Sequence, residues 1–388
     1  MKILAALQYY LPNRTGYTLH VQRVAEALAA RGHRVDVLTA RHRAELAPSE
    51  TIGGVRVSRL WAPLRVSRGA VMPGYPWHAF RAAGDADVVW ISTPLLETAL
   101  WAFVSRLRGK RLVVTHHGDL HLPPGAFNRF VEAFTFANYR VAARAADALV
   151  AYSDDYARHS TWLRPYAAKV RVVHPPIAIP RPDPEAAARC RAALAPGGGP
   201  VVAYAGRFVQ EKRPDVLLRA AMLLRARYPG LCVAFAGERQ LRYEDTFARC
   251  RALLEEAGDL VAFVGLIEDP QALADFYAAC DVLALPSDTE CFALVQVEAM
   301  LCGTPVVASD IPGGRVPVVE TAMGRLFRAG DPRALAEALD EVLRNRSRFV
   351  KQRERVDAAF SLTRTVDAYE AIFAGVDDAA PRLDARTA

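Results

Sequence analysis

Residues 287–307 read Ser-Asp-Thr-Glu-Cys-Phe-Ala-Leu-Val-Gln-Val-Glu-Ala-Met-Leu-Cys-Gly-Thr-Pro-Val-Val, and this segment is the most informative of the chain. The apolar run 282–285 before it predicts a buried strand, and residues 292–301 have a helical pattern. Gly303 stands where a helix commonly ends, and residues 304–308 predict a second buried strand. Strand, loop, helix and strand in this order predict an α/β protein.

Two glutamates of this stretch, Glu290 before the predicted helix and Glu298 within it, are eight positions apart. If all the steps between them were helical, the two backbones would stand about 12 Å apart, more than the roughly 5 to 9.5 Å between the carboxylates of a glycosidase. We therefore expect them to hold different parts of one extended ligand. The helix start between them supplies backbone N–H groups and a positive dipole end, which suit a phosphate. This order of groups suggests a sugar nucleotide.

A second anion-binding segment follows the predicted strand 201–205. Arg207 and Lys212 lie in the next loop, and Pro214 and Asp215 fit the first turn of a helix. Two cations at a strand-to-helix loop can clamp a diphosphate, the arginine by paired donors and the lysine as a point charge. A solvated basic loop is the alternative interpretation of this segment taken alone.

The rest of the chain repeats the alternation of strands and helices. The proline- and glycine-rich segment 175–200 divides two such series, and we predict the interdomain connection there. The pattern predicts a doubly wound α/β architecture in each half. Further strands are predicted at residues 2–7, 34–38, 55–60, 87–92, 111–115, 148–151 and 170–173 in the first half, and at 231–236 and 261–264 in the second.

Composition and charge narrow the class of protein. The chain has 388 residues, of which 52% are hydrophobic, and no apolar run is long enough for a membrane span. The six cysteines show no CxxC spacing, so we expect reduced thiols in a cytoplasmic protein. Residues 1–180 hold 23 Lys and Arg against 12 Asp and Glu, whereas the remainder holds 26 against 30. A basic first half can attract anionic lipid or a phosphorylated substrate; no nucleic-acid module is evident.

Several motifs together resemble the family-4 retaining glycosyltransferases over residues 1 to about 375. They are Gly32-His33-Arg34-Val35, Gly206-Arg207 through Lys212, the pair Glu290 and Glu298, and Cys302-Gly303-Thr304-Pro305-Val306-Val307. The resemblance implies a GT-B fold, with two Rossmann-like domains facing each other across a cleft. It assigns the acceptor to an N-terminal domain, 1–180, and the donor to a C-terminal domain, 181–362. A helix at 363–376 would cross back, and 377–388 would be a mobile tail.

The resemblance also implies site residues, with the nucleotide sugar as a substrate and with no cofactor or essential metal. Arg207 and Lys212 would neutralise the diphosphate, Glu298 would hold the ribose, and Glu290 would orient the donor sugar. His117 would lie near the reacting sugar, although His116 is adjacent. The remaining donor contacts, mostly through backbone, are implied for Gly16, Gly265, Leu266, Phe292, Ala293 and Leu294. Cys291 and Ala293 replace glycines that are common in the family.

Two rival activities stay open. His116, His117, Asp119 and His121 are spaced so that they can ligate a metal for hydrolysis. A GT-B sugar-nucleotide epimerase would share much of the architecture. Asp85-Ala86-Asp87 mimics a metal-binding DxD signature, but it directly precedes a predicted strand, where acids commonly mark the entry turn.

The acceptor is the least determined substrate. Phe127, Phe130 and Phe134 keep a helical spacing near several arginines, which fits either a buried core helix or contact with an anionic membrane. We expect hexosyl transfer from a UDP- or GDP-linked sugar to a lipid-linked or saccharide acceptor in cell-envelope polysaccharide or glycolipid synthesis, at the inner face of the cell membrane. Transfer to a soluble small molecule is the alternative. The sequence does not determine the base, the sugar, the linkage or the oligomeric state.

Overall fold

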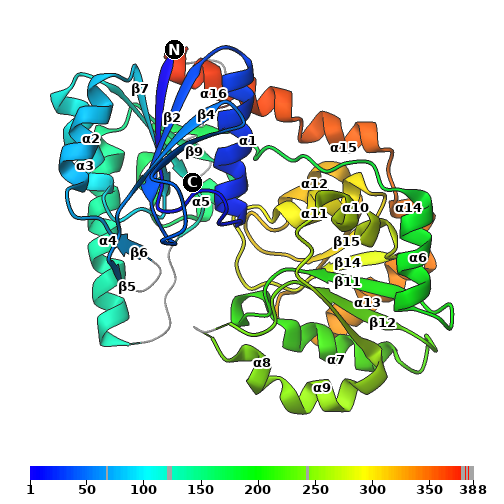
Figure 1. The fold of residues 1–388 in the computed structure, drawn as a ribbon. Helices are drawn as coiled ribbons and strands as arrows, with labels where there is room; N and C mark the ends of the chain where they lie inside the picture. Colours follow the sequence, from blue (N-terminus) through cyan, green and yellow to red (C-terminus); the bar gives the residue numbers. More distant parts are fainter. Residues whose placement is uncertain (67–68, 120–124, 242–243, 377–380, 382, 384–388) are drawn as a thin grey trace. The chain divides into compact units, whose positions relative to one another are not determined.

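The chain folds into two compact units, each built around a parallel sheet (Figure 1). The computed structural model describes residues 1–66, 69–119, 125–241, 244–376, 381 and 383. Unit 1 comprises Met1–Pro176 and Leu362–Ala388, and unit 2 comprises Ile177–Ser361.

The sheet of unit 1 has eight strands in the order β10-β9-β8-β7-β1-β2-β4-β3, all parallel except β3, which pairs antiparallel with β4. Strand β7 is buried along its whole length, as expected of a parallel strand with helices on both faces. A separate hairpin pairs β5 with β6. The strands are β1 Lys2–Ala6, β2 Arg34–Ala40, β3 Ser49–Ile52, β4 Val55–Leu60, β5 Leu64–Val66, β6 Gly69–Val71, β7 Val88–Thr93, β8 Arg111–His116, β9 Ala148–Ala151 and β10 Val170–Val172.

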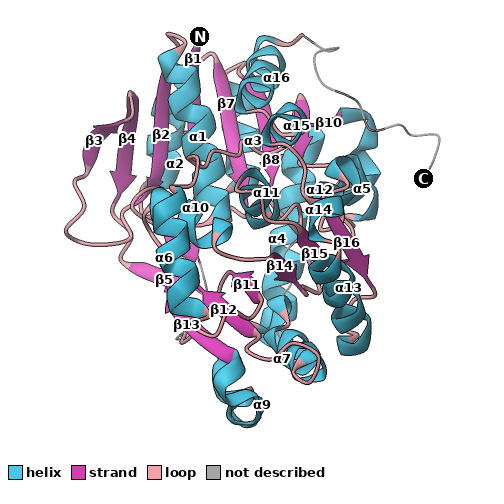
Figure 2. Ribbon diagram, turned by 90° about the vertical axis from the view of Figure 1, so that its right-hand side faces the viewer, coloured by secondary structure: helices cyan, strands magenta, loops and turns pink. Residues whose placement is uncertain are grey.

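Helices cover both faces of this sheet (Figure 2). The last helix, α16, packs on α1 and β8 and so returns the C-terminal segment to unit 1. Its Tyr369 and Phe373 rings lie 5.3 and 5.6 Å from the ring of Trp90 in β7. The helices are α1 Gly16–Ala30, α2 Tyr75–Gly84, α3 Thr98–Leu107, α4 Ala126–Ala145, α5 Asp154–His159, the 3-10 helix η1 Arg164–Lys169, and α16 Leu362–Ala374.

The sheet of unit 2 has six parallel strands in the order β13-β12-β11-β14-β15-β16. Its core joins the strand side chains to helices α7 and α13 through Leu217, Leu218, Leu335 and Leu339, all of which are fully buried. The strands are β11 Val201–Ala205, β12 Cys232–Ala236, β13 Val261–Gly265, β14 Val282–Leu285, β15 Val306–Ser309 and β16 Gly324–Phe327.

Helices again flank the strands (Figure 2). They are α6 Pro184–Leu194, η2 Gln210–Lys212, α7 Pro214–Leu224, α8 Thr246–Arg249, α9 Arg251–Ala257, η3 Gly258–Leu260, α10 Pro270–Ala278, α11 Leu294–Leu301, α12 Val316–Thr321, α13 Pro332–Arg344, α14 Arg346–Phe349 and α15 Arg353–Ala359.

The predicted strands all occur, with ends within two residues of those expected, and the α/β class is confirmed. Strands β3, β5, β6 and β16 were not predicted. Within the segment 175–200, for which the sequence analysis predicted the interdomain connection and no helix, α6 occupies residues 184–194. Asp183 caps this helix with its side chain, and Pro184 occupies the first turn, where a proline removes no needed hydrogen bond.

Most of the predicted tail, 377–388, lies outside the described residues; Pro381, which is described, accepts a hydrogen bond from the Val172 amide at 3.0 Å. Within the described part of the chain, no helix combines the length and the apolar character that crossing a bilayer requires.

Candidate functional site

The strand order of unit 2 reverses between β11 and β14, and most of the predicted donor residues lie at this point. The chain runs outward from β11 through β12 to β13, then returns to β14 and runs the other way. The loops that follow β11 and β14 therefore diverge at the carboxyl edge of the sheet, where open α/β sheets bind their ligands. Arg207 and Lys212 follow β11, and Glu290 follows β14.

The loop after β11 is held close to its neighbouring strand. The Gly206 amide donates to the Ala236 carbonyl at 2.8 Å, and the Tyr204 hydroxyl donates to the Arg207 carbonyl at 2.8 Å. A Cβ on Gly237 would stand only 2.1 Å from the Gly206 carbonyl oxygen, so position 237 needs a glycine. The side chain of Arg207 extends toward Glu211, with a distance of 3.5 Å between Nη2 and Oε1. The backbone under Arg207 is thus fixed while its guanidinium stays partly exposed.

Lys212 and Glu290 meet although 78 positions separate them in the sequence. The lysine Nζ forms an ion pair with Glu290 Oε1, which also accepts a hydrogen bond from the Ser287 hydroxyl at 2.8 Å. The Lys212 side chain is 22% exposed and that of Glu290 is 8% exposed. A cation and a carboxylate with this little access to water interact more strongly than a surface pair. An anionic ligand at this point would compete with Glu290 for the lysine.

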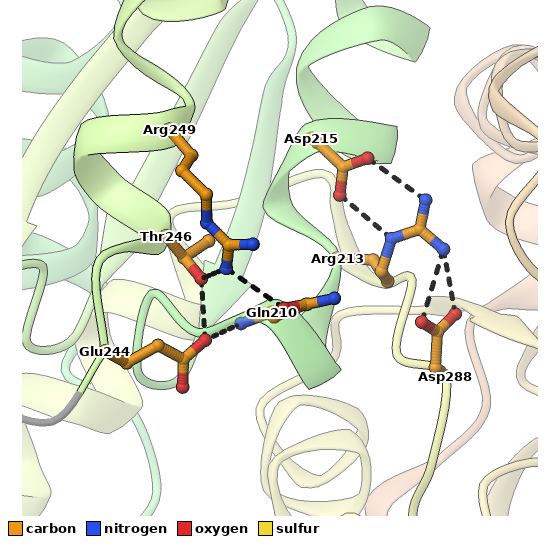
Figure 3. Close-up of polar contacts among 7 residues, drawn as sticks. All are labelled: Gln210, Arg213, Asp215, Glu244, Thr246, Arg249 and Asp288. Carbon is orange, nitrogen blue, oxygen red and sulfur yellow. Dashed lines mark hydrogen bonds and ion pairs between the residues drawn. The ribbon is translucent and has the colours of Figure 1, made fainter. Parts of the chain in front are cut away.

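Arg213 ties the two loops together, a role that the sequence analysis missed (Figure 3). Its Nε and Nη2 atoms each donate to Asp215 at 3.0 Å, and its Nη1 donates to Asp288 at 3.0 and 3.2 Å. The Asp288 amide in turn donates to the Glu211 carbonyl at 2.8 Å. These carboxylates, Asp215 first, raise the pKa of Arg213 further above its already high value. The pairing fixes Lys212 on one side and Glu290 on the other.

A second network supports the outer end of the same loop (Figure 3). Glu244 accepts hydrogen bonds from the Gln210 amide and, at 2.6 Å, from the Thr246 hydroxyl. Arg249 donates to the Gln210 side-chain oxygen at 3.0 Å and to Thr246 at 2.9 Å. The short helix η2, which carries Lys212, is therefore anchored at its first residue.

Helix α11 begins at the same carboxyl edge with a backbone conformation that is rare for alanine. Ala293, its N-cap, has φ of +61°, and within the described residues no side chain caps this helix end. A positive φ favours glycine, which accounts for the glycine expected at this position in the family. The backbone of Ala293 and Leu294 lies at the positive end of the helix. The Phe292 side chain is instead buried 5.4 Å from the Phe360 ring, so only its backbone can serve a ligand.

Glu298 lies one turn farther into α11 and is 7% exposed. The loop at Gly313 closes over the start of this segment, where Glu290 and Gly313 form an isolated parallel bridge. A Cβ on Gly313 would come within 2.6 Å of the Cys291 carbonyl oxygen. Gln296 donates to the Gly314 carbonyl at 2.6 Å from within the same helix. Glu290 is therefore positioned by backbone contacts as well as by Lys212.

Gly265 and Leu266 lie at the same carboxyl edge, at the end of β13. The φ of Gly265 is +86°, and its carbonyl accepts from the Gly237 amide at 2.8 Å. The Leu266 side chain is 58% exposed. An exposed apolar side chain beside a turn can pack against the flat face of a base.

Unit 1 has a corresponding reversal of strand order, between β1 and β7. Gly16 follows β1 and is the first residue of α1, whose N-cap Thr15 accepts a hydrogen bond from the Thr18 amide at 3.2 Å. His117 follows β8, and its ring centroid lies 4.6 Å from that of Tyr17 in the first turn of α1. The two residues predicted for this half of the chain thus belong to neighbouring loops of one sheet edge.

His116 and His117 differ in how their ring nitrogens are used. His116 is buried, with Nδ1 at 2.9 Å from the Thr93 hydroxyl and Nε2 at 2.9 Å from Asp119. His117 Nδ1 pairs with the Tyr152 hydroxyl, while its Nε2 is buried without a partner among the described residues. Burial, then His20 and His116, lower the pKa of His117 well below its usual value. His117 is thus a neutral imidazole with one nitrogen available.

Glu97 is a further site candidate that the sequence analysis passed over. It follows β7 at the N-cap of α3, and its Oε2 is buried without a hydrogen-bond partner in the described part of the chain. Burial raises the pKa of the Glu97 carboxyl to about 7. The available signal was an acidic residue shortly after a buried strand, which is a common position for a ligand contact in an α/β protein.

The metal-site alternative finds no support in the described residues. They contain no group of three or more His, Cys, Asp or Glu side chains placed to hold a metal, and His121 lies outside them. Asp85 and Asp87 lie at the opposite edge of the sheet from His117. There Asp87 accepts from the Lys2 amide at 2.8 Å, and Asp85 pairs with the Lys2 and Arg34 side chains.

Comparison with known proteins connects this geometry to a family. Residues 190–359 match the family described as glycosyl transferases group 1, and residues 15–176 match the glycosyl transferase 4-like domain. The chain is 33% identical to a D-inositol 3-phosphate glycosyltransferase from Thermobispora bispora, over 84% of this chain and 81% of that protein. A protein of the same name from Catenulispora acidiphila, D-inositol 3-phosphate glycosyltransferase 1, is 31% identical over 92% and 90% of the two chains.

Solved structures show the same fold. Anabaena Alr3699/HepE, crystallised with UDP, superposes with a TM-score of 0.76 at 21% identity, over 97% of this chain and all of that one. Sucrose-phosphate synthase from Thermosynechococcus elongatus gives 0.72 at 24% identity, over 98% and 100%. Two Rossmann-like units of this kind constitute the GT-B fold. The chain belongs to the group 1 glycosyltransferases, family 4, and is a glycosyltransferase of the hexosyltransferase class.

Proposed function

We propose that this enzyme transfers a hexose, with retention of anomeric configuration, from UDP-sugar to an acceptor hydroxyl. The observation that carries the proposal is the meeting of Lys212 and Glu290 at the strand reversal of unit 2, beside Arg207 and the start of α11. This arrangement combines cations for a diphosphate with a carboxylate for sugar hydroxyls. HepE, of the same fold, has been crystallised with UDP-glucose, which favours uridine over guanosine as the base.

In the proposed donor complex, each residue acts on a different part of the nucleotide sugar. Lys212 and Arg207 neutralise the diphosphate. Glu298 binds the ribose hydroxyls, and Gly265 with Leu266 borders the base. Glu290 holds the sugar hydroxyls, helped by the backbone of Phe292, Ala293 and Leu294. On this proposal the donor belongs to residues 181–362 and the acceptor to residues 1–180, with helix 363–376 crossing back.

The chemistry requires negative charge to be stabilised on the departing nucleoside diphosphate. The proposal assigns this stabilisation to Arg207, Lys212 and the dipole of α11 rather than to a metal ion. The acceptor attacks from the face that the diphosphate leaves, and a phosphate oxygen takes its proton, so that no covalent glycosyl-enzyme forms. If the Tyr152 hydroxyl donates to His117 Nδ1, the neutral ring carries its proton on Nε2 and can donate to a sugar hydroxyl.

Two acceptor classes have separate support. The names of the relatives, D-inositol 3-phosphate glycosyltransferases, favour a small soluble polyol phosphate. The basic first half and the exposed aromatic helix α4 favour a lipid-linked or envelope saccharide acceptor reached from the cytoplasmic face of the membrane. Transfer assays with myo-inositol phosphates, and in parallel with an extract of lipid-linked saccharides, would distinguish them.

The donor assignment is tested by calorimetric titration of UDP, GDP and ADP into the wild type and Lys212→Ala. We expect UDP to bind most tightly and the variant to lose at least tenfold in affinity. Equal binding of all three nucleotides, or unchanged binding by the variant, would contradict it. Proton NMR of the product then decides between a glycoside with retained configuration and an epimerised nucleotide sugar.

A further inference from the structure

Helix α4 of unit 1 presents to solvent a face made only of apolar and arginine side chains. Its exposed aromatic side chains are Phe127, Phe130 and Phe134, which are 64%, 67% and 52% exposed, and Val141 follows at 46%. The other exposed residues of this helix are alanines at 126, 133 and 137 and arginines at 129, 140 and 144. All residues of α4 are described, and its single acidic residue, Glu132, is partly buried.

These phenylalanines are not part of the core. The core face of α4 is formed by Thr135, Tyr139, Ala142 and Ala143, which are buried. Phe130 and Phe134 instead stack on each other, with centroids 6.4 Å apart and planes at 23°. Of the two alternatives left open by the sequence, a buried core helix therefore does not apply to the phenylalanine stripe. Exposed aromatic side chains in one row leave apolar area in contact with water unless a partner covers it.

The neighbouring helix extends the same surface. Helix α3 packs beside α4 (Figure 1) and exposes Phe103 and Leu107 at 65% and 60%. Arg106 lies between them in the sequence and is also exposed. We call the exposed residues of α3 and α4 the α3–α4 surface. Helices α2, α3 and α4 together contain five arginines and one acidic residue.

The combination of exposed aromatic and arginine side chains indicates one kind of partner. A face with aromatic side chains, arginines and almost no carboxylates is typical of a helix that lies in the headgroup region of a membrane. Anionic headgroups would neutralise the arginines while the aromatic rings enter the acyl boundary. A second copy of the chain, which would bring its own arginines against these, is disfavoured by like-charge repulsion.

We propose that the α3–α4 surface docks on an anionic lipid bilayer, with the Phe127–Phe130–Phe134 row inserted and the arginines at the phosphates. The proposal does not depend on which donor or acceptor the enzyme uses. Docking would hold this part of unit 1 against the membrane while the carboxyl edge of the sheet, with His117 and Glu97, remains the site of chemistry.

The test is sedimentation of the full-length protein with vesicles of phosphatidylcholine alone and of phosphatidylcholine with phosphatidylglycerol. We expect binding to the anionic vesicles at least tenfold stronger than to the neutral ones, with a decrease as salt is raised. Phe130→Ser/Phe134→Ser and Arg140→Glu/Arg144→Glu should each lower the anionic binding at least tenfold. Circular dichroism melting of every variant confirms that it is folded.

A matched control is Leu223→Ser/Val319→Ser, which removes two exposed apolar side chains from α7 and α12 of unit 2, 55% and 64% exposed in the wild type. It should bind vesicles as the wild type does. Absence of wild-type binding at low salt, or equal losses in the control and the α4 variants, would overturn the proposal. So would a concentration-dependent dimer that Phe130→Ser/Phe134→Ser abolishes without any effect on lipid binding.

Discussion

The two strand reversals of this molecule differ in the chemistry of their side chains. At the reversal in unit 2, Lys212, Glu290, Arg213 and Asp288 satisfy one another in ion pairs. At the reversal in unit 1, His117 Nε2 and Glu97 Oε2 are buried without partners among the described residues. A charged network holds its geometry before a ligand arrives, whereas an unsatisfied buried group gains most when a ligand supplies its partner. In the proposed function, the first would bind the diphosphate of the donor and the second the acceptor.

The largest expected effect is at the strand reversal of unit 2, where the ion pairs lie. Lys212→Ala should lower kcat/KM by about 10² to 10³, or about 3 to 4 kcal/mol, because it removes a cation aimed at the leaving group and leaves Glu290 without its counter-ion. Steady-state kinetics with saturating acceptor would measure it. The control is Lys351→Ala, which removes a lysine whose Nζ donates a hydrogen bond to the Arg348 carbonyl. This variant should leave kcat/KM nearly unchanged. A loss of kcat/KM of less than threefold in Lys212→Ala would mean that the ion pairs at the strand reversal of unit 2 have no special role in catalysis.

The strand reversal of unit 1 is tested with a variant of Glu97. Burial raises the pKa of its carboxyl from 4.5 to about 7, so between these values the folded protein binds a proton that the unfolded chain has released. Its stabilising contribution is present below pH 4.5 and is lost as pH rises through 7. Glu97→Gln stays neutral and should be more stable than the wild type by about 1 to 3 kcal/mol at pH 8, with a much smaller difference at pH 5.

Urea unfolding at both pH values would measure this difference. Glu45→Gln, which removes one exposed carboxylate from unit 1, should show no such dependence on pH. An equal effect of Glu97→Gln at pH 5 and pH 8 would mean that this carboxyl titrates normally and that the site is better solvated than its burial indicates.

Variants of Arg213 test whether the ion pairs at the strand reversal of unit 2 act cooperatively. Arg213→Ala and Asp288→Ala should each reduce kcat, and the double variant should fall short of additivity by about 1 kcal/mol, because both break the same link between the Lys212 and Glu290 loops. Arg213→Lys should restore little, since lysine cannot form the paired donors that reach both Asp215 and Asp288. KM for the donor should change less than kcat. Strict additivity would show that the pair does not couple the loops.

The smallest expected effect concerns the backbone of the same reversal. Ala293 has φ of +61°, a conformation that costs alanine about 1 to 2 kcal/mol and glycine almost nothing. The greater freedom of glycine in the unfolded chain cancels part of this gain. Ala293→Gly should therefore stabilise the protein by about 0.5 to 1 kcal/mol in thermal unfolding. Ala322→Gly, at φ of +53°, should give a similar gain without a change in donor affinity. A loss of stability at position 293 would mean that its Cβ makes a needed contact.

Much of this fold could be predicted because the strands are buried on both faces. Continuous apolar runs such as Val201–Ala205 carry their own signal, whatever surrounds them. Strand β16, Gly-Arg-Leu-Phe, gave none, because it is short and lies at the sheet edge. Helix α6 was missed because its two local signals, Asp183 and Pro184, lie among other prolines that read as a linker. Its apolar face is also narrow, with only Ala187 buried.

The residues of the candidate site also fall into two groups, those that the sequence indicated and those that it did not. Arg207, Lys212, Glu290 and Glu298 stand in motifs whose spacing is local, so the sequence indicated them. Arg213 and Glu97 were not indicated, because their importance comes from partners, or from the lack of one, in another loop. The choice between a buried and an exposed helix at 126–145 was equally open, since a row of phenylalanines has the same spacing in either case.

The sequence was enough to establish the alternation of strands and helices, the two-part organisation and the basic character of the first half, and it indicated candidate residues for a diphosphate site. These properties follow from local patterns of side-chain chemistry. The folded structure was needed to show that Lys212 pairs with Glu290 and that Arg213 links their loops. It was also needed to show that His117 Nε2 has no partner among the described residues and that the α4 phenylalanines face solvent. Each depends on which distant segments pack together, and burial and pairing are properties of those contacts rather than of any single segment.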